Sequence, residues 1–427
     1  MVQVKRVVFM VSLFVVCGAL LLGGFQNAAA KDIKLKYVSW MAKGEDKPVL
    51  KEFMNGNPGI VVEDEILEGS KYAQLLKTRL LAGDVPDVML VMFKDFPEYV
   101  REGYLADLSG QPGLELQTQV PSVNDAFTVD GKVYARLISG GINVHPIWYN
   151  KKIFKQLGLE EPTTVDEFLE VCRKIKAADI EPLVFGGKDL WPYRWAQFWG
   201  LTNQVQIAMQ EAQTKDIWEA LYKGVPAATM FKQTLELWAS LVDNAYVGPT
   251  SISMSWPESS QYFVDGGAAM LPQGPWVAGL SEVKNADPEK FELGVFLFPA
   301  EPADGTRYLQ AGFDRCLVVS AGAKYPEEAL KLFNHFASDA VLAEYLGSQT
   351  LTTLLPLEYE LPPIVQKFMT DAADGAYELV SLTFPEAPGL EGELNKTFQN
   401  IQAGATVAEE LERLQNFYEE HKGDIKF

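Results

Sequence analysis

The stretch Phe263-Val-Asp-Gly-Gly-Ala-Ala-Met-Leu-Pro-Gln-Gly-Pro-Trp276 carries most of the information about the fold. Gly266-Gly267 ends the helix that precedes it, because glycine enters the left-handed cap conformation without strain. The apolar run Ala268 to Leu271 is long enough for one buried strand. Pro275 suits the first turn of a new helix, so the pattern places Trp276 where a strand passes into a helix.

Trp276 is therefore a candidate binding residue. In open α/β sheets, ligands bind at the carboxyl ends of strands, where helix N-termini point N–H donors. A tryptophan at such a point offers a flat apolar face to a ligand. The alternative is a Gly-Pro turn whose tryptophan fills the core, and the stretch alone favours that alternative.

A wider pattern adds a resemblance to a known family. A helix, Phe-x-x-Gly-x-Ala-Ala-Met, a short loop and Gly-Pro-Trp resemble the extracellular solute-binding proteins of ABC importers, in particular the maltose-binding-like carbohydrate group (family 1). Gly83-Asp-Val-Pro-Asp-Val88, an aromatic-rich loop and Gly103-Tyr-Leu-Ala-Asp-Leu108 resemble its first lobe. The resemblance spans almost all of residues 31–427. It implies an α/β, two-lobed periplasmic-binding-protein-like fold of class II type, with mixed sheets flanked by helices and hinge crossings between the lobes.

The chain is expected to divide into five segments. These are a signal peptide (1–30), the first part of lobe 1 (31–140), the first part of lobe 2 (141–302), a return to lobe 1 (303–354), and lobe 2 with C-terminal helices (355–427). Gly131 to Ala135 and Ile147 to Phe154 resemble the family's crossing strands.

Hydrophobic periodicity predicts strand, helix, strand, helix, strand at the start, which is a parallel α/β layout. The expected strands are 33–38, 60–62 and 88–92, with Val49, Leu50 and Phe53 on one helix and Tyr72, Leu75, Leu76 and Leu80 on the next. Asp87 is expected to fix the turn before its strand. Further along, strands are expected at 182–185, 293–298 and 316–319, and helices at 165–177, 326–336 and on to 346. Trp191 and Tyr193 are expected in a loop, and Trp195 and Trp199 on one face of the helix that follows it. The chain beyond 354 is expected to be mostly helical. Capping boxes are expected at Thr164 and Thr406.

The N-terminus has the pattern of a secretory signal. Lys5 and Arg6 precede an apolar stretch and the small-residue site Ala28-Ala29-Ala30, which predicts cleavage before Lys31 and export to the periplasm or the extracellular face of the membrane. An uncleaved anchor is the alternative because the apolar stretch is long. A lipoprotein reading of Cys17 is disfavoured because Val16 stands where a small residue is needed. Cys172 and Cys316 are expected on different lobes and unpaired.

Composition excludes some classes of protein. The chain has 427 residues, of which 48% are hydrophobic, as in a globular protein of two domains or more. Its net charge of −20 and the lack of a basic tract argue against nucleic-acid binding.

The sequence contains no recognised catalytic or metal motif. The three histidines match no metal spacing, and there is no nucleophile elbow, P-loop or dinucleotide-binding glycine pattern. The glycine pairs at 140–141, 186–187 and 266–267 are interpreted as turns. A glycoside hydrolase needs two carboxylates, and none of the many acidic residues stands out as a pair. We therefore expect no catalytic residue, metal or cofactor.

The resemblance implies a binding cleft lined by aromatic and polar side chains. The expected stacking residues are Trp40, Trp191, Tyr193 and Trp276, with Trp256 either in the cleft or under a loop; the polar candidates are Lys94, Asp95, Asp314 and Arg315, beside Phe93. Trp195 and Trp199 are expected in the core. Members that bind maltodextrins carry a tryptophan where Val91 stands, which puts the sugar in doubt but not the family.

The predicted function is the extracytoplasmic receptor of an ABC importer. Such a protein, expected to be a monomer, would capture a sugar or oligosaccharide between its lobes and deliver it to membrane permease subunits. The alternatives are another solute, such as an acidic sugar held by Arg136, Arg194 or Arg315, or a polyamine. A secreted glycoside hydrolase is the alternative from another class.

Overall fold

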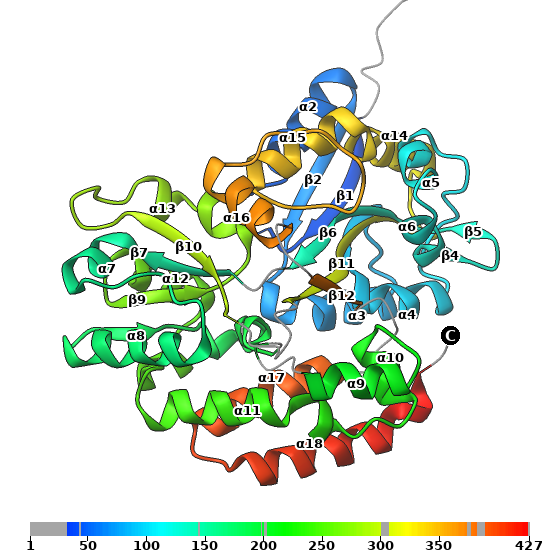
Figure 1. Cartoon of the computed structure of the whole chain (residues 1–427). Helices are drawn as coiled ribbons and strands as arrows, with labels where there is room; N and C mark the ends of the chain where they lie inside the picture. Colours follow the sequence, from blue (N-terminus) through cyan, green and yellow to red (C-terminus); the bar gives the residue numbers. More distant parts are fainter. Residues whose placement is uncertain are drawn as a thin grey trace, which may run out of the picture.

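The computed structural model describes residues 32–41, 44–143, 146–197, 199, 203–299, 307–373, 377–381 and 389–425. These residues form two β-sheets that lie side by side, each with its own helices (Figure 1). The predicted signal peptide, the alternative anchor and Cys17 lie outside the described residues.

The first sheet is mixed. Its strands are β1 (Ile33–Ser39), β2 (Ile60–Ile66), β3 (Val88–Met92), β6 (Arg136–Asn143), β11 (Arg307–Val319) and β12 (Tyr377–Ser381). The order is β12-β11-β3-β1-β2, and β6 also pairs with β11. β1 is parallel to β2 and β3, as predicted, whereas β11 runs antiparallel to β3 and β6.

Helices cover this sheet with the predicted apolar faces. They are α2 (Lys47–Gly56), α3 (Tyr72–Leu81), α4 (Phe96–Arg101), α5 (Glu115–Thr118), α6 (Pro121–Ala126), α14 (Pro326–Ala337) and α15 (Asp339–Gln349). α2 buries Val49, Leu50 and Phe53, as predicted. In α3, Leu75 is 37% exposed, contrary to expectation, because a narrow i, i+4, i+8 stripe is enough to cover the sheet edge.

Asp87 has the structural role predicted for it. Its carboxylate accepts the backbone N–H of Lys36 and of Lys324, each at 2.8 Å, and only 2% of the residue is exposed. It therefore joins three segments at the start of β3.

The second sheet has the order β10-β7-β9-β8. Its strands are β7 (Pro146–Asn150), β8 (Glu181–Leu183), β9 (Ala268–Pro272) and β10 (Leu293–Leu297). β9 is buried at every position, which confirms the buried strand expected in the Gly-Gly to Gly-Pro stretch. The surrounding helices are α7 (Lys151–Leu157), α8 (Val165–Ala177), α9 (Asn203–Glu211), α10 (Ile217–Tyr222), α11 (Ala227–Asp243), α12 (Trp256–Val264) and α13 (Ser281–Lys284).

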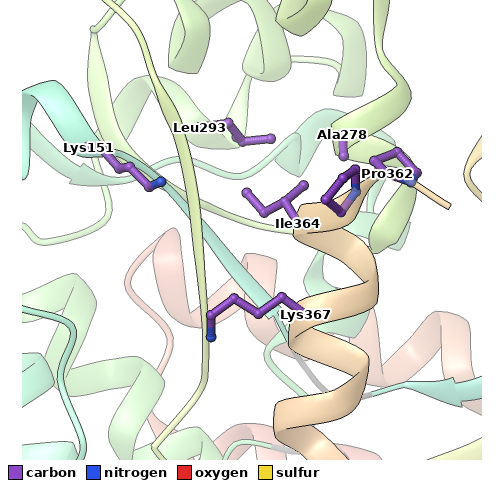
Figure 2. Close-up of a pocket in the computed structure, with 7 residues that line it drawn as sticks. Lys151, Ala278, Leu293, Pro362, Ile364 and Lys367 are labelled. Carbon is purple, nitrogen blue, oxygen red and sulfur yellow. The ribbon is translucent and has the colours of Figure 1, made fainter.

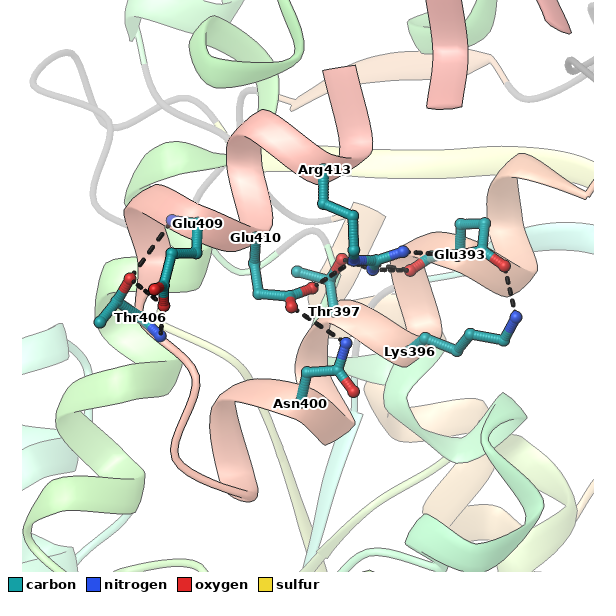
Figure 3. Close-up of polar contacts among 8 residues, drawn as sticks. All are labelled: Glu393, Lys396, Thr397, Asn400, Thr406, Glu409, Glu410 and Arg413. Carbon is teal, nitrogen blue, oxygen red and sulfur yellow. Dashed lines mark hydrogen bonds and ion pairs between the residues drawn. The ribbon is translucent and has the colours of Figure 1, made fainter. Parts of the chain in front are cut away.

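The C-terminal part is mainly helical, with α16 (Pro363–Ala373), α17 (Leu390–Gln402) and α18 (Val407–His421). β12 interrupts it and joins the first sheet, a strand that the sequence did not predict. α17 and α18 pack on α11, and Arg413 connects them through Glu393 and Glu410 (Figure 3). The capping box of Thr406 with Glu409 is confirmed.

Several local predictions were wrong because tertiary pairing overrode the local pattern. Gly131 to Ala135 belongs to the hairpin of β4 (Thr128–Val129) and β5 (Lys132–Val133), and β6 is the strand that leads to the crossing. Gly140-Gly141 lies within β6 and makes no turn: a Cβ on Gly140 would come within 2.7 Å of the Gly312 carbonyl oxygen on β11. At the predicted capping box of α8, Thr164 does accept from Glu167, but the Glu167 side chain bonds Thr163.

The two cysteines of the described chain are free and buried in separate cores. Of the helices within the described ranges, none combines the length and apolarity that crossing a membrane requires. The five-segment division of the chain stays a prediction.

Candidate functional site

Three tryptophans meet where the second sheet faces the first. The ring of Trp191 lies 5.6 Å from that of Trp256 and 6.3 Å from that of Trp276, between centroids. All three are partly exposed, and Trp276 packs against the buried clusters of both sheets. We call Trp191, Trp256 and Trp276 the tryptophan patch. Trp195, which is 5% exposed, contacts Trp276 edge-on, with 5.3 Å between the ring centroids.

Local sequence fixes these rings. Trp276 lies in a short 3-10 helix, η7 (Pro275–Gly279), with Pro275 at its first position, so the predicted helix exists but is tighter than an α-helix. A Cβ on Gly274 would lie 2.3 Å from the Trp276 ring, so only glycine lets the ring fold back. Likewise, a Cβ on Gly186 would lie 2.8 Å from the Trp256 backbone. The glycines thus allow a close approach that larger residues would block.

The first sheet contributes a charged group opposite. The Arg315 guanidinium carbon lies 5.3 Å from the centroid of the Trp40 ring, a cation–π contact. Arg315 Nε donates to Asp314 Oδ2 at 3.0 Å, and Ser139 Oγ donates to the same oxygen at 3.0 Å. Arg315 is only 8% exposed, while the Asp314 side chain is 44% exposed. The acid end of the pair therefore faces outward.

Electrostatics connects the two sheets. Although burial disfavours the charged form of Asp314, the positive charges of Arg315 and of Arg194 hold its pKa below the usual value. Arg194 lies in η5 (Trp191–Trp195) with Trp191 and pairs with Glu391 of α17 at 3.5 Å. Burial raises the pKa of Asp95; Lys94 opposes the rise, and the negative charge of Glu391 adds to it. Groups of the second sheet and α17 therefore act on carboxylates of the first.

The remaining predicted residues have different surroundings. Phe93 packs edge-on against Phe313 at 4.8 Å and Phe127 at 5.4 Å, partly buried in the first core. Lys94 is exposed and binds Asp95 at 3.1 Å. Both belong to η2 (Phe93–Asp95), directly after β3.

Tyr193 does not suit the role expected of it. It lies within the 3-10 helix η5, not in a loop before a helix, and none of its surface is exposed. Its ring stacks on Phe185 and Phe398, and its hydroxyl donates to Gln402 at 2.6 Å. A 3-10 helix turns successive side chains differently from an α-helix, which sends Tyr193 into the core. We therefore leave Tyr193 out of the site. Trp195 and Trp199, at 5% and 4% exposure, are core residues as predicted.

Sequence reasoning missed Ser139, Glu391 and the charge interaction of Arg194 with Asp314. Ser139 and Glu391 carry no local signal, because their proximity depends on how distant segments pack. Arg136, one of the arginines considered for an acidic ligand, is fully buried and pairs with Asp339 at 3.0 Å. Burial lowers its pKa to about 10.

A surface recess of about 520 Å³ lies elsewhere, between β10, η7 and the start of α16 (Figure 2). Its lining is mainly apolar, with two lysines at the rim: Lys151, Ala278, Leu293, Pro362, Pro363, Ile364 and Lys367. None of the predicted site residues lines it. It is separate from the tryptophan patch.

The arrangement favours binding over chemistry. Partly exposed aromatic faces lie in the tryptophan patch, and Arg194 of the same short helix as Trp191 acts on the charged group Asp314, which suits a ligand with both apolar faces and hydroxyls. Within the part of the chain that the structure describes, no three histidine, cysteine or acidic side chains are grouped to hold a metal ion.

Comparison with known proteins gives a consistent result. The sequence model of a family described as bacterial extracellular solute-binding protein matches residues 39–343. A multiple sugar-binding protein of Streptococcus mutans is 29% identical over 307 residues, which are 70% of this chain and 69% of the relative.

Solved structures share the fold. The binding protein RafE in complex with raffinose matches with a TM-score of 0.72 and 23% identity, over 91% of this chain and 100% of its own. The ligand-free form of RafE from Streptococcus pneumoniae matches with a TM-score of 0.64 and 22% identity, over 93% and 100%. These matches confirm the predicted two-lobed α/β fold.

Proposed function

The chain belongs to the bacterial extracellular solute-binding protein family, and from this premise we propose that it binds a neutral sugar or short oligosaccharide between its lobes. The observation that supports the proposal is the tryptophan patch together with Arg194, which shares a short helix with Trp191 and whose charge acts on Asp314 of the first lobe. Asp314 binds Arg315, which contacts Trp40. Sugar rings have apolar faces that stack on indoles and hydroxyls that bind charged groups, so both halves are needed.

The proposed contacts follow from exposure. Trp191, Trp256 and Trp276 would stack on the sugar, because each is partly exposed and held by neighbouring rings. Asp314 would accept hydrogen bonds from sugar hydroxyls, because its side chain is partly exposed while Ser139 and Arg315 bind one of its oxygens. Four more side chains would complete the first-lobe wall of the site: Trp40, Phe93, Lys94 and Asp95. The negative charge of Glu391 contributes to the raised pKa of Asp95, so these two carboxylates lie near each other.

The arginines argue for a neutral ligand. Each arginine that an acidic sugar could use already has a carboxylate partner: Arg315 with Asp314, Arg194 with Glu391, and Arg136 with Asp339. An anionic ligand would have to displace one of these carboxylates, which a neutral sugar does not.

Delivery to a transporter completes the proposed role. Members of the family are extracellular solute-binding proteins, and similar proteins carry the name of ABC transporter binding proteins. The lobes of this chain would close on the sugar by rotation at the crossings that connect β6 to β7 and β10 to β11. The closed form, a monomer, would then present the sugar to membrane permease subunits.

A calorimetric screen tests the proposal. Purified chain is titrated with mono- and oligosaccharides, including raffinose, with glucuronic acid and spermidine as charged comparators. We expect micromolar or tighter binding of at least one neutral sugar, recovered unchanged by chromatography. Binding of the charged compounds alone, or cleaved sugar accumulating with turnover, would contradict the proposal in favour of another solute or a hydrolase.

A further inference from the structure

Gln273 has an unusual environment for a polar side chain. It lies between β9 and η7, three residues before Trp276, and none of its surface is exposed. Among the described residues, neither Oε1 nor Nε2 of its amide has a hydrogen-bond partner. Buried polar groups are paired in the great majority of cases, so an amide with both atoms unpaired needs an explanation.

The backbone holds Gln273 in place. Its N–H donates to the Pro146 carbonyl at 3.3 Å, and its own carbonyl accepts from Trp148 Nε1 at 2.9 Å. Both partners belong to β7, which begins at Pro146 directly after the crossing from the first sheet. The backbone of Gln273 is therefore fixed against β7, the strand at which the chain passes from the first sheet to the second.

The surrounding segment contacts both lobes. Trp276 packs against the buried clusters of both sheets. Gly279 lies so close to Thr350, the residue after α15 of the first lobe, that a Cβ there would come within 2.7 Å of the threonine hydroxyl. We call residues 272–280 the seam. A change in the angle between the lobes must alter the packing of the seam.

Burial of an unpaired amide is costly. Such a group loses its hydrogen bonds to water and gains none from protein, which shifts an equilibrium by a factor of about five or more. This penalty applies to the lobe arrangement seen here, in which Trp276 of the seam packs against the buried clusters of both sheets. An arrangement that lets water reach the amide avoids the penalty.

We propose that Gln273 sets the balance between the closed and open arrangements of the lobes by favouring the open one. Its amide is unpaired when the seam is packed and hydrated when the lobes separate. The effect on ligand affinity rests on the proposed function, whereas the effect on lobe arrangement does not. A ligand contact is a poor alternative, because a side chain without accessible surface cannot touch a ligand in the present arrangement.

Two substitutions that should shift the balance between the open and closed arrangements in opposite directions test this proposal. Gln273→Met keeps the length of the side chain and removes the unpaired amide, so the sugar-free variant should have a smaller radius of gyration by small-angle X-ray scattering than wild type. It should bind the sugar found in the screen about fivefold more tightly, because the closed form is more populated. Gln273→Glu adds a charge that needs water, so it should have a larger radius and weaker binding.

Gln117 provides the matched control. It is equally buried, but its Nε2 donates to the Ala135 carbonyl at 2.9 Å and its Oε1 accepts from Leu137 at 2.8 Å. Gln117→Met should therefore lower the melting temperature and leave the radius of gyration and the affinity of the folded protein unchanged.

The outcomes separate the explanations. Weaker binding by Gln273→Met at an unchanged radius would make Gln273 a ligand contact and overturn the proposal. A changed melting temperature with unchanged radius and affinity would make it a local packing defect and also overturn it. If wild type binds none of the sugars, the proposed function fails, but the sugar-free radii of Gln273→Met and Gln273→Glu still decide the proposal.

Discussion

Truncation of Trp276 distinguishes a ligand contact from a core residue. Its ring is partly exposed and meets Trp195 at 5.3 Å and Trp191 at 6.3 Å. Two aromatic pairs at about 0.5–1.5 kcal/mol each give a loss of roughly 1–3 kcal/mol in folding free energy for Trp276→Ala. At about 2–4 °C per kcal/mol for a lobe of 150–250 residues, the melting temperature should fall by about 2–12 °C.

Affinity should fall much further. A tryptophan that stacks on a ligand in a water-excluded site contributes roughly 2 kcal/mol or more on truncation. This is about thirtyfold in dissociation constant, which isothermal calorimetry with the sugar from the screen resolves directly.

Trp238 is the control. It is fully buried, contacts Phe185, Tyr193 and Phe398 edge-on, and its Nε1 donates to the Phe398 carbonyl at 2.9 Å. Trp238→Ala should lose roughly 3–5 kcal/mol of stability while the folded fraction binds normally. The reasoning is refuted if Trp276→Ala shows that same pattern, a large drop in melting temperature with wild-type affinity.

Three further predictions concern titration and thiol chemistry. The pKa of Asp314 is lowered in the folded protein, so its pair with Arg315 stabilises the fold at pH values above the unfolded-state pKa, and this stabilisation is lost as the pH falls through the folded-state pKa. Asp314→Asn should therefore be less stable than wild type at neutral pH. Thermal melts should show that this difference vanishes in acid. Burial raises the pKa of Asp46, whose carboxylate accepts hydrogen bonds from the Tyr37 and Tyr345 hydroxyls, each at 2.9 Å. Wild type should therefore lose stability as the pH rises from the unfolded-state pKa of Asp46 through its folded-state pKa, and the stability of Asp46→Asn should depend less on pH in that range. Equal slopes of stability against pH for the two proteins would contradict this. Cys172 and Cys316 should react with a thiol reagent only after unfolding, without reductant, and labelling of the native protein would contradict their burial.

Local signals predicted the elements that carry the site. β9 could be placed from the apolar run Ala268 to Leu271, which lies between a glycine pair and a proline, and η7 from Pro275, which suits a first helical turn. Asp87 could be assigned to the turn before β3, and its bond to the Lys36 N–H agrees. The predicted strands and helices of the first lobe follow from periodicity, which reports the face that must be buried.

Contacts between distant segments could not be predicted in this way. Tyr193 looked like a cleft residue beside Trp191, yet the same short helix turns one ring outward and the other into a core completed by Phe398. Glu391 had no signal, because its effect on Asp95 depends on how α17 packs against α11 and η5. β12 joins the first sheet only because β11 offers it an edge.

The charges between the lobes bear on what decides closure. Arg194 stabilises the charged form of Asp314, which favours the two lobes together, whereas the negative charge of Glu391 disfavours the charged form of Asp95, which favours separation. Since one of these charge interactions favours the closed arrangement and the other favours the open one, electrostatics alone does not decide between the two arrangements. A change of about 1.4 kcal/mol shifts such an equilibrium tenfold, which is less than one stacked tryptophan contributes. An unpaired amide at Gln273 acts on the same scale, so stacking on the ligand has to outweigh it for the closed form to predominate.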